Sequence, residues 1–180
     1  MKKNLFFISM IFLNLYAVGQ NNSFYSLQVK DIDGSTINLS SFQGKKILFC
    51  TIPLNGSNSS IDDLDSLIRA NGLKIKVIGI PSIEDGFSDS MKVSVKNIYQ
   101  SRGINILLTE GMYTKKTSGS NQSSLIMWLT KKDLNGSFNL EVKGNGQKFF
   151  IDKNGKLFAT VNPEVSYLSP LIRNYINIQF

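Results

Sequence analysis

The order of apolar and polar positions predicts a chain of short strands and helices. An alternating segment, Phe24–Val29, precedes the polar turn Asp31–Gly34, and a second short segment, Thr36–Leu39, follows it. The Asp-Gly pair supplies the positive φ that a tight turn between antiparallel strands needs. These residues are therefore predicted to form an N-terminal β-hairpin.

A strand, a helix and a second strand are predicted directly after the hairpin. Ile47–Ile52 is apolar on both faces, which is typical of a central parallel strand. Ser59–Ala70 carries apolar residues at helical spacing and is followed by an Asn-Gly pair that favours a helix end. Leu73–Ile80 is again a strand, and Pro81 ends it. We expect a right-handed βαβ unit.

The same patterns place the remaining elements. They are a helix over Phe87–Gln100, a strand over Ile104–Leu108, a polar loop over Lys115–Ser124, a helix over Leu125–Lys131, a hairpin of Phe149–Asp152 and Leu157–Val161, and a helix over Leu168–Ile176. We find no internal repeat and no domain boundary. This order predicts an α/β fold, a thioredoxin-like three-layer sandwich with an N-terminal β-hairpin and an inserted central segment, over one domain of residues 20–180.

The N-terminal residues have the features of a targeting segment. Lys2 and Lys3 precede an apolar run, Leu5–Tyr16, and the small residues of Ala17–Gly19 form a cleavage site. The run of about a dozen residues is shorter than the ~20 that a spanning helix needs. We expect a signal peptide over residues 1–19 and an exported protein, periplasmic or secreted, with no stable membrane span after cleavage. An uncleaved N-terminal anchor is the alternative.

Charge and composition narrow the classes of function. The formal net charge is +7, and it is +5 without the two lysines of the leader. Lys and Arg are scattered rather than clustered, so no nucleic-acid surface is expected. The chain has one cysteine, Cys50, and no histidine. An internal disulfide and catalysis by Ser-His-Asp or Cys-His groups are excluded, and we expect neither a metal site nor a cofactor.

The turn between the first core strand and the helix that follows it is the candidate site. Asn55 and Gly56 lie in this turn, and the helix is expected to begin near Ser59 or Ser60. Free N–H groups and the positive end of a helix dipole would stabilise a thiolate there. The side chain of Asn55 does not ionise, so the predicted geometry of a redox site lacks its nucleophile.

Five segments in the same order resemble the glutathione peroxidase family, which includes thioredoxin-dependent peroxidases. They are Phe24–Gly34, Leu39–Lys45, Gly79–Pro81, Gly119–Thr130 and Asn145–Gly155. Gly119–Thr130, for example, is similar to the family's Gly-Pro-Asn-x-His-Pro-Leu-Tyr-x-Trp-Leu-Thr. The resemblance spans roughly residues 23–176. It implies the thioredoxin-like fold, thiol-dependent reduction of hydroperoxides and a part in the response to oxidative stress.

The resemblance also assigns four site positions. The family's peroxidatic Cys or selenocysteine falls on Asn55, its Gln on Glu84, its Trp on Gly144 and its Asn on Asn145. Only the Asn is kept, and a resolving cysteine has no match. A carboxylate at position 84 would also oppose thiolate formation nearby. The chain is therefore interpreted as a degenerate member that lacks the peroxidatic cysteine.

Three other features are interpreted as structural rather than functional. Cys50 lies inside the apolar strand and is expected to be a buried, unreactive thiol. Trp128 is expected in the core, at helical spacing with its apolar neighbours. Asp62, Asp63 and Asp65 are interpreted as charge at a helix N-terminus rather than as metal ligands.

Two functions follow from these residues. The first is a non-catalytic module that binds an unknown small ligand or protein at the former active-site pocket, near Asn55, Glu84 and Asn145. The second is a weak thiol peroxidase that uses Cys50. The accessibility of the Cys50 thiol separates them.

Overall fold

A central five-stranded sheet organises the chain. The computed structural model describes residues 23–56 and 59–180, so the predicted signal peptide lies outside the described residues. The sheet has the order β5-β4-β3-β6-β7, in which β3, β4 and β5 run parallel and β6 and β7 are antiparallel to their neighbours. A separate two-stranded antiparallel sheet, β1-β2, forms the predicted N-terminal hairpin.

The strand bounds agree with most of the predicted segments. They are β1 Gln28–Lys30, β2 Thr36–Asn38, β3 Lys46–Thr51, β4 Ile75–Ile80, β5 Leu107–Leu108, β6 Lys148–Ile151 and β7 Leu157–Val161. In the hairpin the first strand is shorter than expected, because Phe24–Ser26 forms a 3-10 turn that turns the Phe24 ring into the core. The register pairs Cys50 of β3 with Gly79 of β4. A side chain at Gly79 would come within 2.9 Å of Ile52, so close packing requires glycine there.

The helices follow the predicted order, with one addition, and α2 begins at Lys92 rather than at the predicted Phe87. They are α1 Ser59–Asn71, α2 Lys92–Gln100, α3 Ser124–Thr130, α4 Lys132–Asn135 and α5 Pro170–Asn177, with 3-10 turns at Leu39–Phe42, Asp89–Met91 and Lys116–Asn121. The short α4 was not predicted, because four residues carry too little periodicity to detect. Pro170 stands in the first turn of α5, where a missing N–H is tolerated. None of the helices in the described part of the chain is long and apolar enough to cross a membrane.

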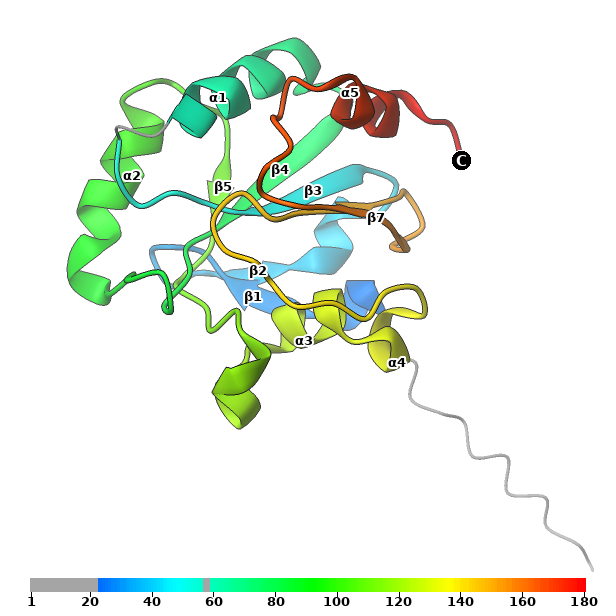
Figure 1. The fold of residues 1–180 in the computed structure, drawn as a ribbon, viewed down its shortest axis with the longest axis horizontal. Helices are drawn as coiled ribbons and strands as arrows, with labels where there is room; N and C mark the ends of the chain where they lie inside the picture. The colour runs from blue at the N-terminus through cyan, green and yellow to red at the C-terminus, as the bar shows by residue number, and fades with distance from the viewer. Residues whose placement is uncertain (1–22, 57–58) are drawn as a thin grey trace, which may run out of the picture.

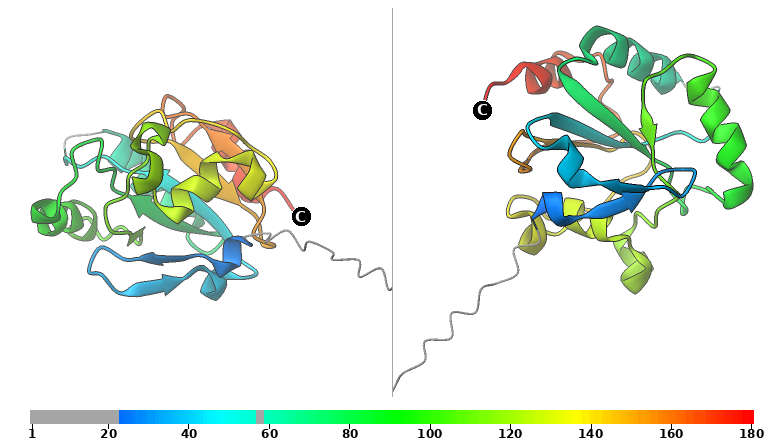
Figure 2. Two further views of the ribbon diagram at one scale, coloured as in Figure 1. Left: turned by 90° about the horizontal axis from the view of Figure 1, so that it is seen from below. Right: turned by 180° about the vertical axis from the view of Figure 1, so that it is seen from behind.

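Two layers of packing cover the two faces of the sheet. In Figure 1, α1, α2 and α5 lie on one side of the sheet, and α3 and α4 lie on the other. Figure 2 shows the β1-β2 hairpin on the side of α3, where backbone hydrogen bonds from Ile32 to Leu108 and from Glu110 to Lys30 attach it to the β5 segment. The mixed α/β sandwich with an N-terminal hairpin is the predicted architecture.

Trp128 belongs to the core, as the sequence indicates. Its side chain on α3 is 3% exposed, and its ring centroid lies 5.2 Å from that of Phe24. This pair joins α3 to the start of the described chain. Trp128 therefore has a packing role.

Candidate functional site

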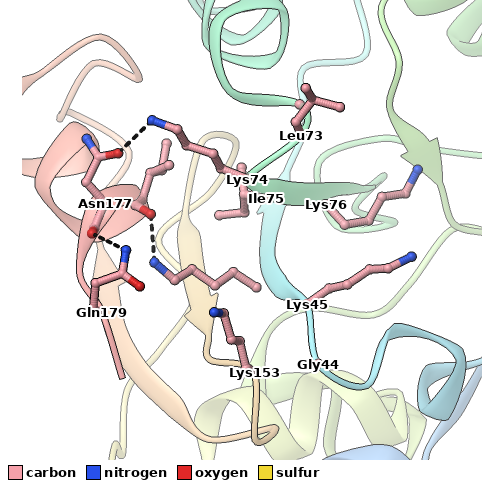
Figure 3. Close-up of a pocket in the computed structure, with 12 residues that line it drawn as sticks. Gly44, Lys45, Leu73, Lys74, Ile75, Lys76, Lys153, Asn177 and Gln179 are labelled. Atoms are coloured by element: carbon pink, nitrogen blue, oxygen red, sulfur yellow. Dashed lines mark hydrogen bonds between the residues drawn. The ribbon is translucent and has the colours of Figure 1, made fainter.

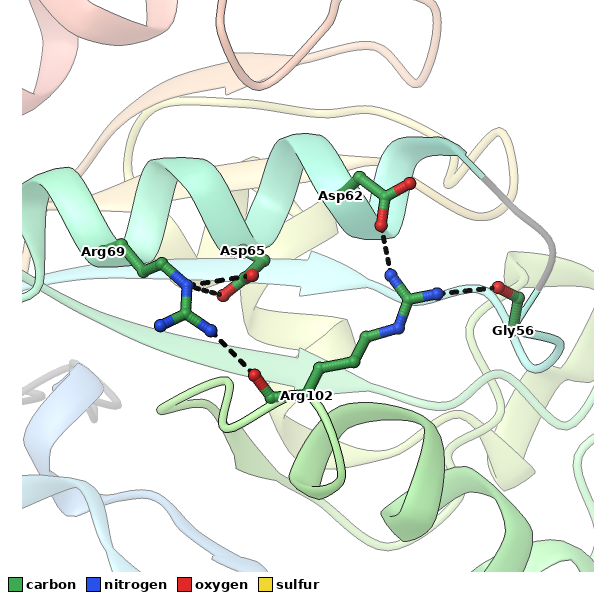
Figure 4. Close-up of polar contacts among 5 residues, drawn as sticks. All are labelled: Gly56, Asp62, Asp65, Arg69 and Arg102. Carbon is green, nitrogen blue, oxygen red and sulfur yellow. Dashed lines mark hydrogen bonds and ion pairs between the residues drawn. The ribbon is translucent and has the colours of Figure 1, made fainter.

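The turn after β3 carries Asn55, the residue on which the resemblance to the glutathione peroxidase family places the peroxidatic cysteine. Asn55 is exposed in this turn, between the last residue of β3, Thr51, and the first residue of α1, Ser59. The Arg102 guanidinium, from the segment after α2, donates a hydrogen bond of 3.2 Å to the carbonyl of Gly56 and forms an ion pair with Asp62 of α1 (Figure 4). Arg102 thus brings positive charge to the turn that holds Asn55.

The three aspartates of α1 point to three different partners. Asp62 pairs with Arg102, and Asp65 pairs with Arg69 at 2.9 Å, as Figure 4 shows. Asp63 accepts a hydrogen bond of 2.6 Å from the Ser166 hydroxyl. Each carboxylate is occupied by a separate protein group, which agrees with their interpretation as helix charge.

The loop before β6 is tied to the end of β3 by Thr51. The Thr51 hydroxyl donates to the carbonyl of Gly144 at 2.6 Å and accepts from the backbone N–H of Gln147 at 3.0 Å. The N–H of Gly146 donates to the Thr51 carbonyl at 2.8 Å. Gly144 and Gly146 have φ values of 127° and 91°. An L-residue is strained in this conformation, so the backbone itself disfavours a Trp at position 144.

Asn145 connects the end of β3 to the loop after β4. With its amide oriented so that the nitrogen donates, Asn145 hydrogen bonds to the Ile52 carbonyl at 2.8 Å and to Asp85 Oδ2 at 3.1 Å. The acidic residue that meets Asn145 is therefore Asp85, and not its neighbour Glu84. The sequence signal for Asp85 was its place in the same short segment, Ser82–Gly86.

Glu84 faces the segment after Met112 instead of Asn145. Its carboxylate accepts hydrogen bonds from the N–H groups of Thr114 at 2.8 Å and Lys115 at 2.9 Å, and from the Ser118 hydroxyl at 2.5 Å. Partial burial raises the pKa of Glu84, but these hydrogen bonds outweigh it and lower the pKa to about 2. Glu84 therefore anchors the 114–118 segment as a carboxylate.

Glu84→Gln is expected to destabilise the fold in a pH-dependent way. The folded pKa lies below the ordinary value, so this contribution is present above about pH 4.5 and is lost as the pH falls toward 2. For a partly exposed group we expect about 1 kcal/mol, or a thermal midpoint about 2–4 °C lower at pH 7. Urea unfolding at pH 7 and at pH 3 measures the difference. Glu164→Gln, at an exposed glutamate, is the control. If Glu84→Gln lowers the free energy of unfolding by the same amount at pH 3 as at pH 7, the role of the Glu84 carboxylate is contradicted.

Cys50 is buried under the candidate site and is not part of its surface. Its side chain is 0% exposed, and its Sγ donates a weak hydrogen bond of 3.9 Å to the Ile78 carbonyl. Burial is the main cause that raises the pKa of the thiol to about 11, against smaller lowering effects of Tyr167 and Lys148. The expected burial of Cys50 is confirmed, and its low reactivity stays a prediction.

Lys148 and Tyr167 form a buried polar pair beside Cys50. Lys148 is 1% exposed, and its ammonium donates to the Gly146 carbonyl at 2.7 Å and lies 4.3 Å from the centre of the Tyr167 ring. Burial lowers the pKa of Lys148. No side chain in the described residues forms a hydrogen bond of normal geometry with the Tyr167 hydroxyl.

A cleft of about 290 Å³ opens next to Asn145. Its wall on one side is the start of α1, with Ser59 and Asp63, and on the other the loop after β7, with Glu164 and Ser166. Lys148 lies at its inner end. Hydroxyls, carboxylates and an ammonium group thus surround one small concave space.

The structure brings together only part of the site that the sequence predicted. Asn145 lies on the cleft, Asn55 stands on the exposed turn, and Glu84 is turned to the 114–118 segment. Asp85, Arg102 and Lys148 were not predicted. No local signal identifies Arg102, because it reaches the turn from 46 positions away. Lys148 lies three residues after Asn145, within the segment that resembles the family, but the pattern gave no sign that its ammonium would line the site.

Comparisons with known proteins agree with the fold. The chain is 27% identical over 159 residues to probable glutathione peroxidase 3, mitochondrial, of Arabidopsis thaliana, a match that spans 82% of this chain and 72% of the relative. No family model matches the chain.

Solved structures give the same architecture. The apo structure of Trgpx matches with a TM-score of 0.64 at 22% identity, over 86% of this chain and 93% of the other. GPX1 of T. cruzi matches with a TM-score of 0.62 at 17% identity, over 86% and 96%. A thioredoxin family thiol:disulfide interchange protein from Chlorobium tepidum matches with a TM-score of 0.56 at 15% identity, over 84% and 93%. These likenesses establish the thioredoxin-like sandwich.

Proposed function

Because the chain is a glutathione peroxidase-like protein of the thioredoxin fold, we propose that it acts as a non-catalytic binding module. One observation carries the proposal. The chain's single thiol, Cys50, is fully buried, while the turn where the family places its nucleophile presents Asn55. A buried thiol cannot reach a peroxide, and an amide does not form a nucleophile comparable to a thiolate.

The proposed binding site is the cleft beside Asn145. Its lining supplies an ammonium at Lys148, carboxylates at Asp63 and Glu164, and the hydroxyl of Ser166. Side chains of both charges in one small space suit a ligand that itself carries both charges, such as a short peptide. The proposal also includes export, which rests on the basic and apolar N-terminal residues alone.

Glutathione is the probe that tests this site, because it is a zwitterionic peptide and the relative is named a glutathione peroxidase. In a titration with glutathione, we expect the amide NMR signals of Ser59, Asn145 and Ser166 to shift. The concentration dependence of these shifts should give a millimolar affinity. Glu164→Trp places an indole at the rim of the cleft and should weaken these shifts. The control is Lys156→Trp, at an exposed residue just before β7.

Two results would contradict the proposed binding site. Shifts that are absent up to about 10 mM glutathione, a concentration that detects even weak complexes, argue against a peptide-like ligand. Shifts of equal size in wild type and Glu164→Trp place the binding elsewhere.

A further inference from the structure

A second, larger cleft lies at the opposite end of the sheet. Its volume is about 530 Å³, and it is formed by the segment before β3, the loop between α1 and β4, the turn after β6 and the end of α5. It lies where β3 and β4 begin, whereas Asn55 and Asn145 lie near the point where β3 ends. The five steps between the six residues of β3, at ~3.3 Å each, separate the two ends by roughly 17 Å.

Lysine side chains dominate this cleft. Five of them line it: Lys45, Lys46, Lys74, Lys76 and Lys153. No aspartate or glutamate is among its lining residues. In the part of the chain that the structure describes, none of the five lysines forms an ion pair with a carboxylate. In Figure 3, the side chains of Lys45 and Lys76 extend side by side, and Lys74 extends to the opposite side, toward Asn177.

Two of the lysines are held by the end of α5. Lys46 is 5% exposed, and its ammonium donates to the carbonyls of Ile176, at 2.7 Å, and Ile178. The ammonium of Lys74 donates to Asn177 Oδ1 at 3.0 Å, as drawn in Figure 3. These contacts fix part of the positive charge in place. No hydrogen bond from the ammonium groups of Lys45, Lys76 and Lys153 to another described residue is present, so these three can turn to a ligand.

The fold concentrates like charges here without compensating them. Burial first, and then Lys153 and Lys74, lower the pKa of Lys46. Burial and Lys45 lower the pKa of Lys76. Lysines that repel each other in a cleft are stabilised by an anion that binds between them.

We propose that this cleft binds a small oxyanion of several charges, of the oligophosphate or phosphorylated-metabolite class. A concave space of about 530 Å³ is within the range of small-molecule sites. Lysines that separate segments bring to one cleft suit the phosphate groups of a ligand with several charges, because each ammonium is a flexible point charge with three donors. The proposal does not depend on the function proposed for the cleft beside Asn145.

Calorimetric titration with tripolyphosphate tests the proposal. The triple variant Lys45→Gln, Lys76→Gln, Lys153→Gln removes three charges from the cleft and leaves Lys46 with its structural contacts. We expect affinity to fall roughly 30-fold or more, since three charge contacts are lost. The control triple variant, Lys131→Gln, Lys132→Gln, Lys143→Gln, removes the same net charge at exposed positions and should change affinity less than about 3-fold. The single variant Lys153→Gln, at an exposed turn, repeats the test if the triple variant does not fold.

Several results would overturn the inference. One is the absence of tripolyphosphate binding at low salt. Another is an equal loss of affinity in the two triple variants, which would mean a non-specific charge effect. A lipid source of the phosphate is tested with vesicles of phosphatidylcholine, with and without phosphatidylglycerol. Binding to the anionic vesicles without binding to tripolyphosphate would replace the small ligand by a membrane surface.

Discussion

Hydrogen peroxide and alkyl hydroperoxides are expected to be consumed no faster with this protein than in a reductant-only control. The expectation holds with both the thioredoxin and the glutathione system as reductant. The Cys50 thiol is 0% exposed and its pKa is raised to about 11, so only on the order of one molecule in ten thousand carries the thiolate at pH 7. Asn55 offers no alternative nucleophile at the exposed turn.

The state of Cys50 distinguishes the possible outcomes. A thiol-reactive dye should label native protein at least ~1,000-fold more slowly than unfolded protein, because labelling requires the core to open. Turnover that Cys50→Ser abolishes would support a weak thiol peroxidase and contradict the binding module. Turnover that survives Cys50→Ser would mean that another group reduces the peroxide, and it would overturn the proposed function.

The fold was predictable from sequence because its signals are local. The apolar run of β3, the helical spacing of α1 and the Asp-Gly turn of the hairpin each act within a dozen residues, and all three form as predicted. The four residues of α4 carried no such period. The burial of Cys50 followed from the same apolar run.

The candidate site was less predictable because its contacts are distant in sequence. Arg102 reaches Gly56 across 46 positions, and Thr51 reaches Gly144 across 93. Whether Glu84 or Asp85 contacts Asn145 depends on how one turn directs two neighbouring side chains. Glu84 bonds to Thr114, and Asp85 bonds to Asn145. The lysine cleft, likewise, arises from residues that look scattered along the chain.

Asn55→Cys, in a Cys50→Ser background, is expected to produce a reactive thiol. The new side chain would be exposed, in the turn that leads to the N-terminus of α1, with the Arg102 guanidinium bonded to the adjacent Gly56 carbonyl. The positive end of the α1 dipole and the Arg102 guanidinium both favour the thiolate. We therefore expect the pKa of the new thiol to lie about one unit below the ordinary ~8.5. The measurement is the rate of alkylation as a function of pH.

Two further substitutions identify which groups set that pKa. Arg102→Gln should raise it by several tenths of a unit, whereas the control Arg173→Gln, at an exposed arginine of α5, should leave it unchanged. The resemblance to the family, which places Glu84 beside the nucleophile, predicts that Glu84→Gln lowers the pKa of the thiol. The contacts of Glu84 with Thr114, Lys115 and Ser118 predict no change instead, because that carboxylate is bonded to another segment of the chain. A thiol that titrates at or above 8.5 with Arg102 intact would show that the turn no longer supports thiolate chemistry.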